Sequence, residues 1–203
     1  MNTRSGAEEA VAATRIWLER AVIGLNLCPF AKPVHLHDRI RYFVSDSHSS
    51  ARLLEDLMAE LNALAAADSQ QCETTLLIHP HVLTDFSDYN DFLGQADDAV
   101  SELGLEGVIQ VASFHPRYQF EGAAPDDIEN YTNRSPYPML HLLRESSVER
   151  AVTTYPDTTA VYRKNIETLR RLGHEGWRRL WLVEAPQEAT MRPGPKKSAD
   201  SEQ

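Results

Sequence analysis

Three short runs of β-branched and apolar residues, separated by amphipathic helical patterns, constrain the fold of this chain most strongly. The runs cover residues 39–44, 74–79 and 107–114. Between them, residues 50–66 and 85–103 carry apolar side chains at the three- and four-residue spacing of a helix with one buried face. Near-continuous apolar strands that alternate with helices favour a parallel sheet covered on both faces. We therefore predict a core of three strands joined by two helices.

Cap residues and further helical patterns complete the predicted fold. Residues 45–50 and Asp85 supply N-caps for the two core helices. The prediction is an α/β fold, with a small, mostly parallel sheet of three to four strands flanked by helices. The other predicted elements are an N-terminal helix over residues 7–27 that Pro29 ends, C-terminal helices over residues 138–152 and 159–172, the second ended by Gly173, and a candidate last strand over residues 180–183.

Length and composition indicate one domain. A chain of 203 residues with 42% hydrophobic content can bury one substantial core, so we predict a single α/β domain over residues 7–184. Residues 1–6 and 186–203 bury little, and we predict flexible tails there. Glu8 and Glu9 interrupt the apolar stretch that a signal peptide needs, and no apolar run approaches the length of a membrane span. We therefore expect a soluble, cytoplasmic protein without a membrane partner.

The balance of charges argues against nucleic acid as a partner. The formal net charge is -10, whereas nucleic-acid binding draws its affinity from Lys and Arg that neutralise phosphates. The nine glycines are scattered, and none belongs to a phosphate-binding loop pattern. The expected partner is a small molecule. Neither a cofactor nor an oligomeric state follows from the sequence.

Histidines gather where the predicted strands end. His48 follows the first strand, His79 and His81 close the second, and His115 closes the third. In open parallel sheets, ligands bind outside the carboxyl ends of the strands, which lie at one edge. A single histidine at such a place is more often a surface or structural residue than a catalytic one. The sequence therefore predicts a site at this edge and assigns His115 to it first.

The segment from Phe114 to Phe120 carries the densest chemistry in the chain. Arg117 and Tyr118 follow His115 directly, and an aromatic and basic run at a strand end is typical of a pocket wall. We predict that His115 acts as a general acid or base. Arg117 and Tyr118 are predicted to bind the substrate.

Residues 133–138, Asn-Arg-Ser-Pro-Tyr-Pro, are expected to begin the next helix. Ser135 suits its N-cap and Pro136 its first position. A helix N-terminus beside an arginine presents amides and a guanidinium to a carboxylate or phosphate. The predicted roles are an anion contact for Arg134, a catalytic role for Asn133 and substrate binding for Tyr137.

Of the two cysteines, Cys28 is the candidate for chemistry. It precedes Pro29, which disfavours the helical conformation at Cys28 and predicts an exit turn that presents the thiol outward. A helix C-terminus disfavours the thiolate, however, so Cys28 is a weak nucleophile unless a cation lies near it. The alternative is a small buried apolar residue. Cys72 is predicted to be structural, and no disulfide is expected in a reducing compartment.

Four blocks of the sequence carry a resemblance to a known family. They are residues 27–31 (Leu-Cys-Pro-Phe-Ala), 89–93 (Tyr-Asn-Asp-Phe-Leu), 107–120 and 133–144. Together they resemble an uncharacterised bacterial family, domain of unknown function 1415, over residues 7–181. The resemblance implies a bacterial, cytosolic, single-domain protein in which these blocks form one unit. It implies no activity and no substrate.

Three functions remain open at this stage. The first is a small-molecule enzyme with a pocket at the strand ends, where His115 is the acid or base, Arg134 holds an anion, and Asn133 and Cys28 assist. The second is a redox protein that binds a metal or haem. Its candidate ligands are Cys28, His79, His81 and His115. The third is a non-catalytic module that binds a peptide or another subunit. The first function requires His115, Arg134 and Cys28 to line one pocket.

Overall fold

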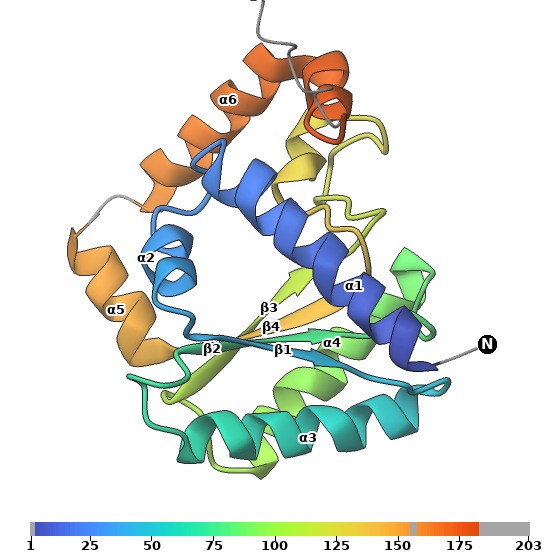
Figure 1. The fold of residues 1–203 in the computed structure, drawn as a ribbon, viewed down its shortest axis with the longest axis vertical. Helices are drawn as coiled ribbons and strands as arrows, with labels where there is room; N and C mark the ends of the chain where they lie inside the picture. Colours follow the sequence, from blue (N-terminus) through green and yellow to red (C-terminus); the bar gives the residue numbers. More distant parts are fainter. Residues whose placement is uncertain (1–2, 155–157, 183–203) are drawn as a thin grey trace, which may run out of the picture.

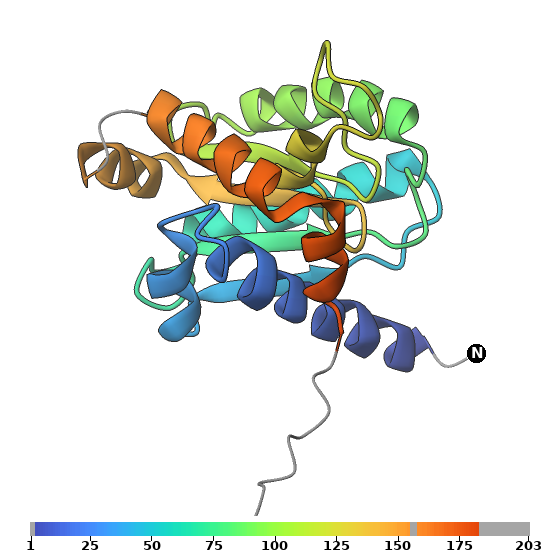
Figure 2. The same ribbon diagram turned by 90° about the horizontal axis from the view of Figure 1, so that it is seen from above.

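Helices cover both faces of a four-stranded sheet in this computed structural model, which describes residues 3–154 and 158–182 (Figures 1 and 2). Among the described residues, no helix has the length and apolar character needed to cross a membrane. The strands are β1 (Ile40–Val44), β2 (Thr74–Ile78), β3 (Ile109–Phe114) and β4 (Met139–Arg144), in the order β1-β2-β4-β3.

The sheet is mixed, so the prediction of a mostly parallel sheet is wrong. β1 and β2 are parallel, whereas β4 lies between β2 and β3 and is antiparallel to both. β1, β2 and β3 do run in one direction, as the alternation of strands and helices predicts. β4 comes from residues that were predicted to begin a helix, because a short apolar run has no periodicity that separates a buried strand from a buried helix.

The two core helices form as predicted. α3 (Ser50–Ala66) begins after Ser49, whose side chain accepts a hydrogen bond from the Arg52 amide, and α4 (Phe86–Glu102) begins after Asp85, which accepts one from Ser87. The remaining helices are α1 (Thr3–Trp17), which continues as the π-helix η1 (Leu18–Ile23), α2 (Ala31–Leu36), the 3-10 helix η2 (Ile128–Thr132), α5 (Glu145–Thr154) and α6 (Thr158–Arg179).

Three predicted boundaries differ from the structure. The first helix begins at Thr3, inside the segment that was predicted to be a tail. In the described part of the expected last strand, residues 180–182 form a turn and a bend that continue from α6, and residue 183 lies outside the described residues. Gly173 breaks the helical backbone with a positive φ, as predicted, but a second helical segment of α6 follows it directly. The predicted tail over residues 186–203 lies outside the described residues.

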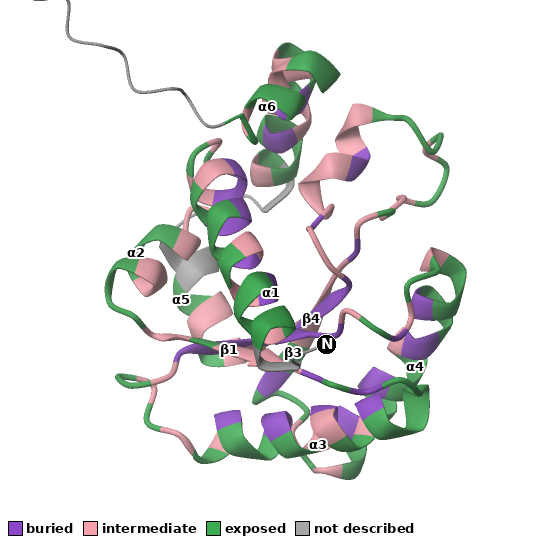
Figure 3. Cartoon of the chain, turned by 45° about the vertical axis from the view of Figure 1, so that its right-hand side comes forward, coloured by how far each residue is buried: buried purple, intermediate pink, exposed green. Residues whose placement is uncertain are grey.

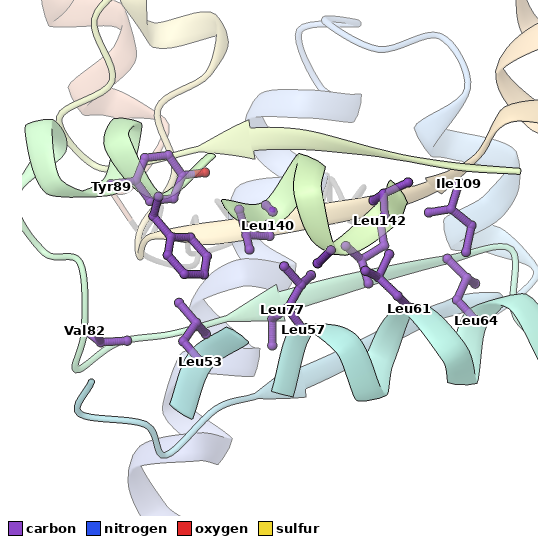
Figure 4. Close-up of a cluster of buried hydrophobic side chains, with 14 residues drawn as sticks. Leu53, Leu57, Leu61, Leu64, Leu77, Val82, Tyr89, Ile109, Leu140 and Leu142 are labelled. Atoms are coloured by element: carbon purple, nitrogen blue, oxygen red, sulfur yellow. The ribbon is translucent and has the colours of Figure 1, made fainter. Parts of the chain in front are cut away.

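Each face of the sheet has its own hydrophobic core. Leu77, Leu140 and Leu142 point toward α3 and α4, where they meet a row of leucines from α3 and Phe92 of α4 (Figure 4). On the opposite face, alternate strand residues such as Ile78 and Met139 pack against α1, η1 and α6. Burial accordingly follows one stripe of each of the helices α3 and α4 (Figure 3), and all five residues of β2 are buried. The period-2 pattern of the strands thus sorts side chains between two cores.

One edge of the sheet gathers the segments that follow β1, β2 and β3 and the segment that precedes β4. Backbone hydrogen bonds continue past the ladders there: the His79 amide donates to the Pro138 carbonyl at 3.0 Å, and the His115 amide donates to that of Asn133 at 3.2 Å. The sequence therefore correctly predicts that the strand-end segments lie together. The sequence-based prediction that residues 133–138 begin a helix is wrong. They lead into the strand β4, so no helix N-terminus is available there to bind an anion.

Arg144 at the end of β4 donates to carbonyls in the last turn of α3 and in the segment after it. Its Nη2 donates to Leu64 and Ala67 at 2.6 Å each, and its Nε donates to Cys72 at 3.4 Å. Arg144→Met should lower the free energy of unfolding by about 2 kcal/mol, because it removes the Arg144 donors from the half-buried Ala67 and Cys72 carbonyls, whereas the Leu64 carbonyl keeps the Ala67 amide at 3.2 Å. Urea unfolding measures the change. Arg52→Met is the control: it removes an exposed ion pair with Glu55 and should change stability by less than about 0.5 kcal/mol.

Candidate ligand-binding cavity

A cavity of about 490 Å³ opens between α1, the end of α6 and the loop before β4. All three tryptophans of the chain line it, together with Tyr131 and two arginines. No histidine, cysteine or carboxylate is among the described residues that line it. The side chains that define it are Trp17, Trp177, Trp181, Tyr131, Arg20 and Arg134.

Trp17 at the end of α1 ties the cavity to the sheet. Its ring packs edge-on against Phe114, the last residue of β3, with centroids 5.3 Å apart. Its indole Nε1 donates a hydrogen bond of 2.8 Å to the carbonyl of Arg134. Trp17 is buried, so both contacts are held in the core between α1 and the sheet. The backbone position of Arg134 is therefore fixed by a side chain that lies 117 positions away.

The second wall comes from the end of α6, beyond Gly173. Trp177 is buried and packs edge-on against Tyr131 with ring centroids 5.0 Å apart. Trp181 packs edge-on against Trp177 at 5.5 Å and remains 37% exposed. Edge-to-face contacts of this kind hold aromatic rings in defined orientations. The wall is therefore a set of flat apolar surfaces that extends from the core to the solvent.

Arg134 enters the cavity with its orientation fixed by three contacts. Its Nε donates to the Tyr118 carbonyl at 3.3 Å and its Nη2 donates to the Pro125 carbonyl at 2.5 Å. The guanidinium carbon lies 4.3 Å from the centre of the Tyr131 ring. Within residues 3–154 and 158–182, it forms no ion pair with a carboxylate. The charge is held in place but is not neutralised.

Arg20 of η1 lines the same cavity and, like Arg134, donates its hydrogen bonds to backbone carbonyls. Its Nη1 donates to the Leu180 carbonyl at 2.8 Å and to that of Leu182 at 3.4 Å. Its Nε and Nη2 have no hydrogen-bond partner in the part of the chain that the structure describes. Two cations thus border one aromatic cavity, and both are held by neutral carbonyls.

His115 does not line the cavity: it is buried and packs against Phe86 and Tyr89 of α4. Its Nδ1 accepts the amide of Arg117 at 3.0 Å, and its Nε2 faces the Leu83 carbonyl at 3.2 Å and so carries the proton. Burial lowers the pKa of His115, and the nearby charge of Arg117 adds to that effect. Both ring nitrogens are occupied by backbone groups, so in this structure the imidazole joins the loops after β2 and β3.

The other residues assigned from the 114–120 and 133–138 segments serve local contacts. Arg117 is exposed and pairs with Asp85 at 3.0 Å. Tyr118 packs against other aromatic rings, with a centroid distance of 5.2 Å to Phe86. The Asn133 side-chain amide donates to the Ser113 carbonyl at 3.1 Å. Tyr137 packs against the core between α1, α6 and the sheet, and its carbonyl accepts a hydrogen bond of 2.6 Å from Ser135.

Cys28 lies in the turn region after η1, away from the lining of the cavity. Its side chain packs against the core between the sheet and α1, η1 and α6, and burial raises the pKa of its thiol. The neighbouring Leu27 carbonyl accepts a hydrogen bond of 2.9 Å from Asn165 of α6. Of His115, Arg134 and Cys28, which the enzyme hypothesis places in one pocket, Arg134 alone lines this cavity.

The alternative ligand set of Cys28, His79, His81 and His115 is not assembled around one point. Among the described residues, no group of three or more His, Cys, Asp or Glu side chains has the arrangement of a metal site. His79 is buried against Tyr89, whereas His81 is exposed and stacks on His48 with centroids 4.9 Å apart. His115 also packs against Tyr89, with centroids 5.0 Å apart, so His79 and His115 share one aromatic neighbour, whereas the stacked pair of His48 and His81 does not contact it.

The cavity walls were largely missed from the sequence. Trp177 and Trp181 are spaced as neighbours on one helical face, but residues 180–183 were interpreted as a strand. Trp17 and Arg20 lie in a helix that was recognised only for its apolar stripe. Arg134 lines the cavity, but the helix that was expected to follow it is the strand β4.

Comparison with known proteins identifies a family and nothing closer. No curated protein and no solved structure matches the chain. A family model described as a protein of unknown function (DUF1415) matches residues 9–179, which is most of the chain and includes every wall of the cavity except Trp181. The chain therefore belongs to this family of unknown function.

Proposed function

We propose that this protein binds a small organic anion with a flat apolar body in the tryptophan-lined cavity, with Arg134 as the anion contact. The observation that carries the proposal is the charge of Arg134 in an aromatic cavity without a carboxylate. The chain has 30 acidic and 20 basic residues, so a cavity with two arginines and no acidic lining residue departs strongly from its average surface.

The geometry of Arg134 supports recognition of an anion. Its Nε and Nη2 already bind backbone carbonyls, and its plane lies over Tyr131. A guanidinium held in this way loses little conformational entropy when its remaining N–H groups meet a ligand. Carboxylate, phosphate and sulfonate groups match its planar donors, and hydrogen bonds between charged partners are stronger than neutral ones.

The walls define the rest of the ligand. A cavity of about 490 Å³ lies within the range of roughly 300–1,000 Å³ that small-molecule sites occupy. Trp17, Trp177 and Tyr131 present aromatic surface, which favours a ring or another flat apolar group. Among the described residues, the lining contains no histidine, cysteine or carboxylate, so it supports binding more strongly than catalysis by His115 or Cys28.

Two dyes that share a ring system test this proposal. One is 8-anilino-1-naphthalenesulfonate, and the other is N-phenyl-1-naphthylamine, which lacks the sulfonate. We expect the sulfonate dye to bind at one site per chain and about 10-fold or more tightly than the neutral dye. Energy transfer from tryptophan reports the location, because Trp17, Trp177 and Trp181 are all the tryptophans of the chain and all line this cavity.

Arginine variants separate the site from general dye binding. Arg134→Gln should weaken binding of the sulfonate dye by about 10- to 100-fold, the loss expected for a hydrogen bond to a charged group. Arg117→Gln removes an exposed arginine outside the cavity and should change the dissociation constant less than twofold. Equal affinity for the two dyes, or equal affinity of wild type and Arg134→Gln, contradicts the proposal. Arg134→Lys keeps the charge without the planar donors and should bind with intermediate affinity.

A further inference from the structure

We infer that residues 174–182, the C-terminal arm, form a hinged gate to the cavity that Arg20 latches shut. The arm supplies two of the aromatic walls, Trp177 and Trp181. What enters through the gate rests on the function proposed above. The hinge and the latch rest on the contacts of the arm itself.

Gly173 is the hinge. Its φ of 64° and ψ of 173° break α6, and side-chain-bearing residues rarely adopt this backbone conformation. Gly176 allows the arm to turn back closely on the helix before it, since a Cβ there would lie 2.6 Å from Cδ1 of Leu172. Two glycines three positions apart thus permit a sharp change of direction at the base of the arm.

Besides Arg20, the contacts that hold the arm among the described residues are those of His174 and Trp177 with Tyr131 and the packing of Leu180 against the core. Trp177 is its one buried residue, whereas Trp181 is 37% exposed and Leu182 is 66% exposed. The ion pairs of Glu175 with Arg178 and Arg179 lie within the arm, so they do not tie it to the rest of the chain. A segment with one buried residue and exposed ends opens at low free-energy cost relative to global unfolding.

Arg20 is the latch. Among the residues that the structure describes, it alone donates side-chain hydrogen bonds to the arm from elsewhere in the chain, at Leu180 and Leu182. These carbonyls lie at the C-terminal end of the arm, where helical backbone lacks donors and a cation is favoured. Arg20 also lines the cavity, and among the described residues only its Nη1 has a hydrogen-bond partner. Arg20 therefore joins the arm to whatever anion the cavity holds.

Ligand binding and closure of the arm are coupled by this arrangement. A ligand in the cavity contacts Trp177 and Trp181 on the arm and the free donors of Arg20, so it stabilises the closed arm. Opening moves the two tryptophans away and admits or releases the ligand. Motions of short hinged segments of this kind commonly control access to a binding site.

Hydrogen exchange measured by mass spectrometry on the full chain tests the latch without any ligand. In Arg20→Gln, amides of residues 177–182 should exchange about 10-fold or more faster than in wild type, while those of β2 keep their rates. Arg15→Gln is the matched control from the same helical segment: Arg15 lies over Tyr42 and should leave the arm unchanged. Arg20→Lys should give intermediate rates. Equal exchange of the arm in wild type and Arg20→Gln overturns the latch.

Addition of 8-anilino-1-naphthalenesulfonate to wild type then tests the coupling. At saturation, exchange of residues 177–182 should slow by about 10-fold or more, and the dissociation rate of the dye should rise by a similar factor in Arg20→Gln. Dye binding without slower exchange overturns the gate and leaves the proposed binding function intact. Absence of dye binding to wild type contradicts the proposed function and the coupling, whereas the exchange of the unliganded arm still decides the latch.

Discussion

The free energy of unfolding should fall by several kcal/mol as the pH is lowered from 6.5 to 4, because two histidines in the cores resist protonation. Burial lowers the pKa of His79 to about 4 and that of His141 to about 4. His79 uses its Nδ1 proton to bind the Val82 carbonyl at 3.0 Å, and its Nε2 is buried without a partner in the described part of the chain. His141 lies 2.7 Å from Thr74 Oγ1, whose hydroxyl in turn donates to the Leu142 carbonyl.

The direction follows from the order of protonation. An unfolded chain protonates its histidines near pH 6.5, whereas the folded chain holds these two neutral until about pH 4. Stability is therefore complete above pH 6.5 and is lost as the pH falls toward the folded pKa values. At about 1.4 kcal/mol per pKa unit, each histidine contributes roughly 3 kcal/mol to the loss. His115, whose pKa is also lowered by burial, adds to it in the same direction.

Urea unfolding at pH 7.0, 6.0, 5.0 and 4.5 measures this dependence. The double variant His79→Asn and His141→Gln should lose most of the slope, because Asn keeps a donor at the position of Nδ1 and Gln keeps one at the position of Nε2. His37→Asn changes an exposed ring and should keep the wild-type slope. The same pH dependence in wild type and in the double variant shows that carboxylates or other groups cause the loss.

The central elements of the fold were predictable because their signals are local. The β1-α3-β2-α4-β3 succession depends on apolar runs and on caps at Ser49 and Asp85, all of which act within a few residues. The meeting of strand ends at one edge followed from the common direction of β1, β2 and β3. These strands keep that direction even though β4 separates two of them.

β4 was not predictable because its conformation is set by partners far away in the sequence. The run from Met139 to Arg144 is short and apolar, so it suits a buried strand or a buried helical turn equally well. The gap between β2 and β3 selects the strand, since both neighbours present unpaired backbone groups toward it. Pairing of Thr74 with Leu143 joins residues that no local pattern connects.

The cavity was only partly predictable, because most of its walls come from segments that are distant in the sequence. Arg134 is recognisable as a cation in a dense polar and aromatic segment, and it does line the cavity. Its surroundings come from α1 and from the arm after Gly173, and the bond from Arg20 to Leu180 spans 160 positions. Such walls form only when α6 packs beside α1, which depends on the three-dimensional arrangement of the two cores.

Tyr89→Phe should lower the free energy of unfolding by about 3 kcal/mol through the loss of one hydroxyl group. Tyr89 is fully buried in α4, and its hydroxyl accepts the Phe114 amide at 3.0 Å and donates to the Met139 carbonyl at 2.9 Å. It thereby closes the last residue pair between β3 and β4. Burial raises the pKa of Tyr89, so the hydroxyl stays protonated and can serve both groups.

The phenylalanine ring keeps the packing against His79 and His115, so the loss isolates two hydrogen bonds. Each backbone group left buried and unpaired costs about 1–3 kcal/mol, and the midpoint of thermal unfolding should fall by on the order of 10 °C. Tyr42→Phe is the matched control, because the Tyr42 hydroxyl is buried with no hydrogen-bond partner among the described residues. Its removal should be neutral or slightly stabilising, since an unpaired buried hydroxyl costs free energy in the folded state. Equal losses in the two variants rule out a specific role for the Tyr89 hydroxyl in joining β3 to β4.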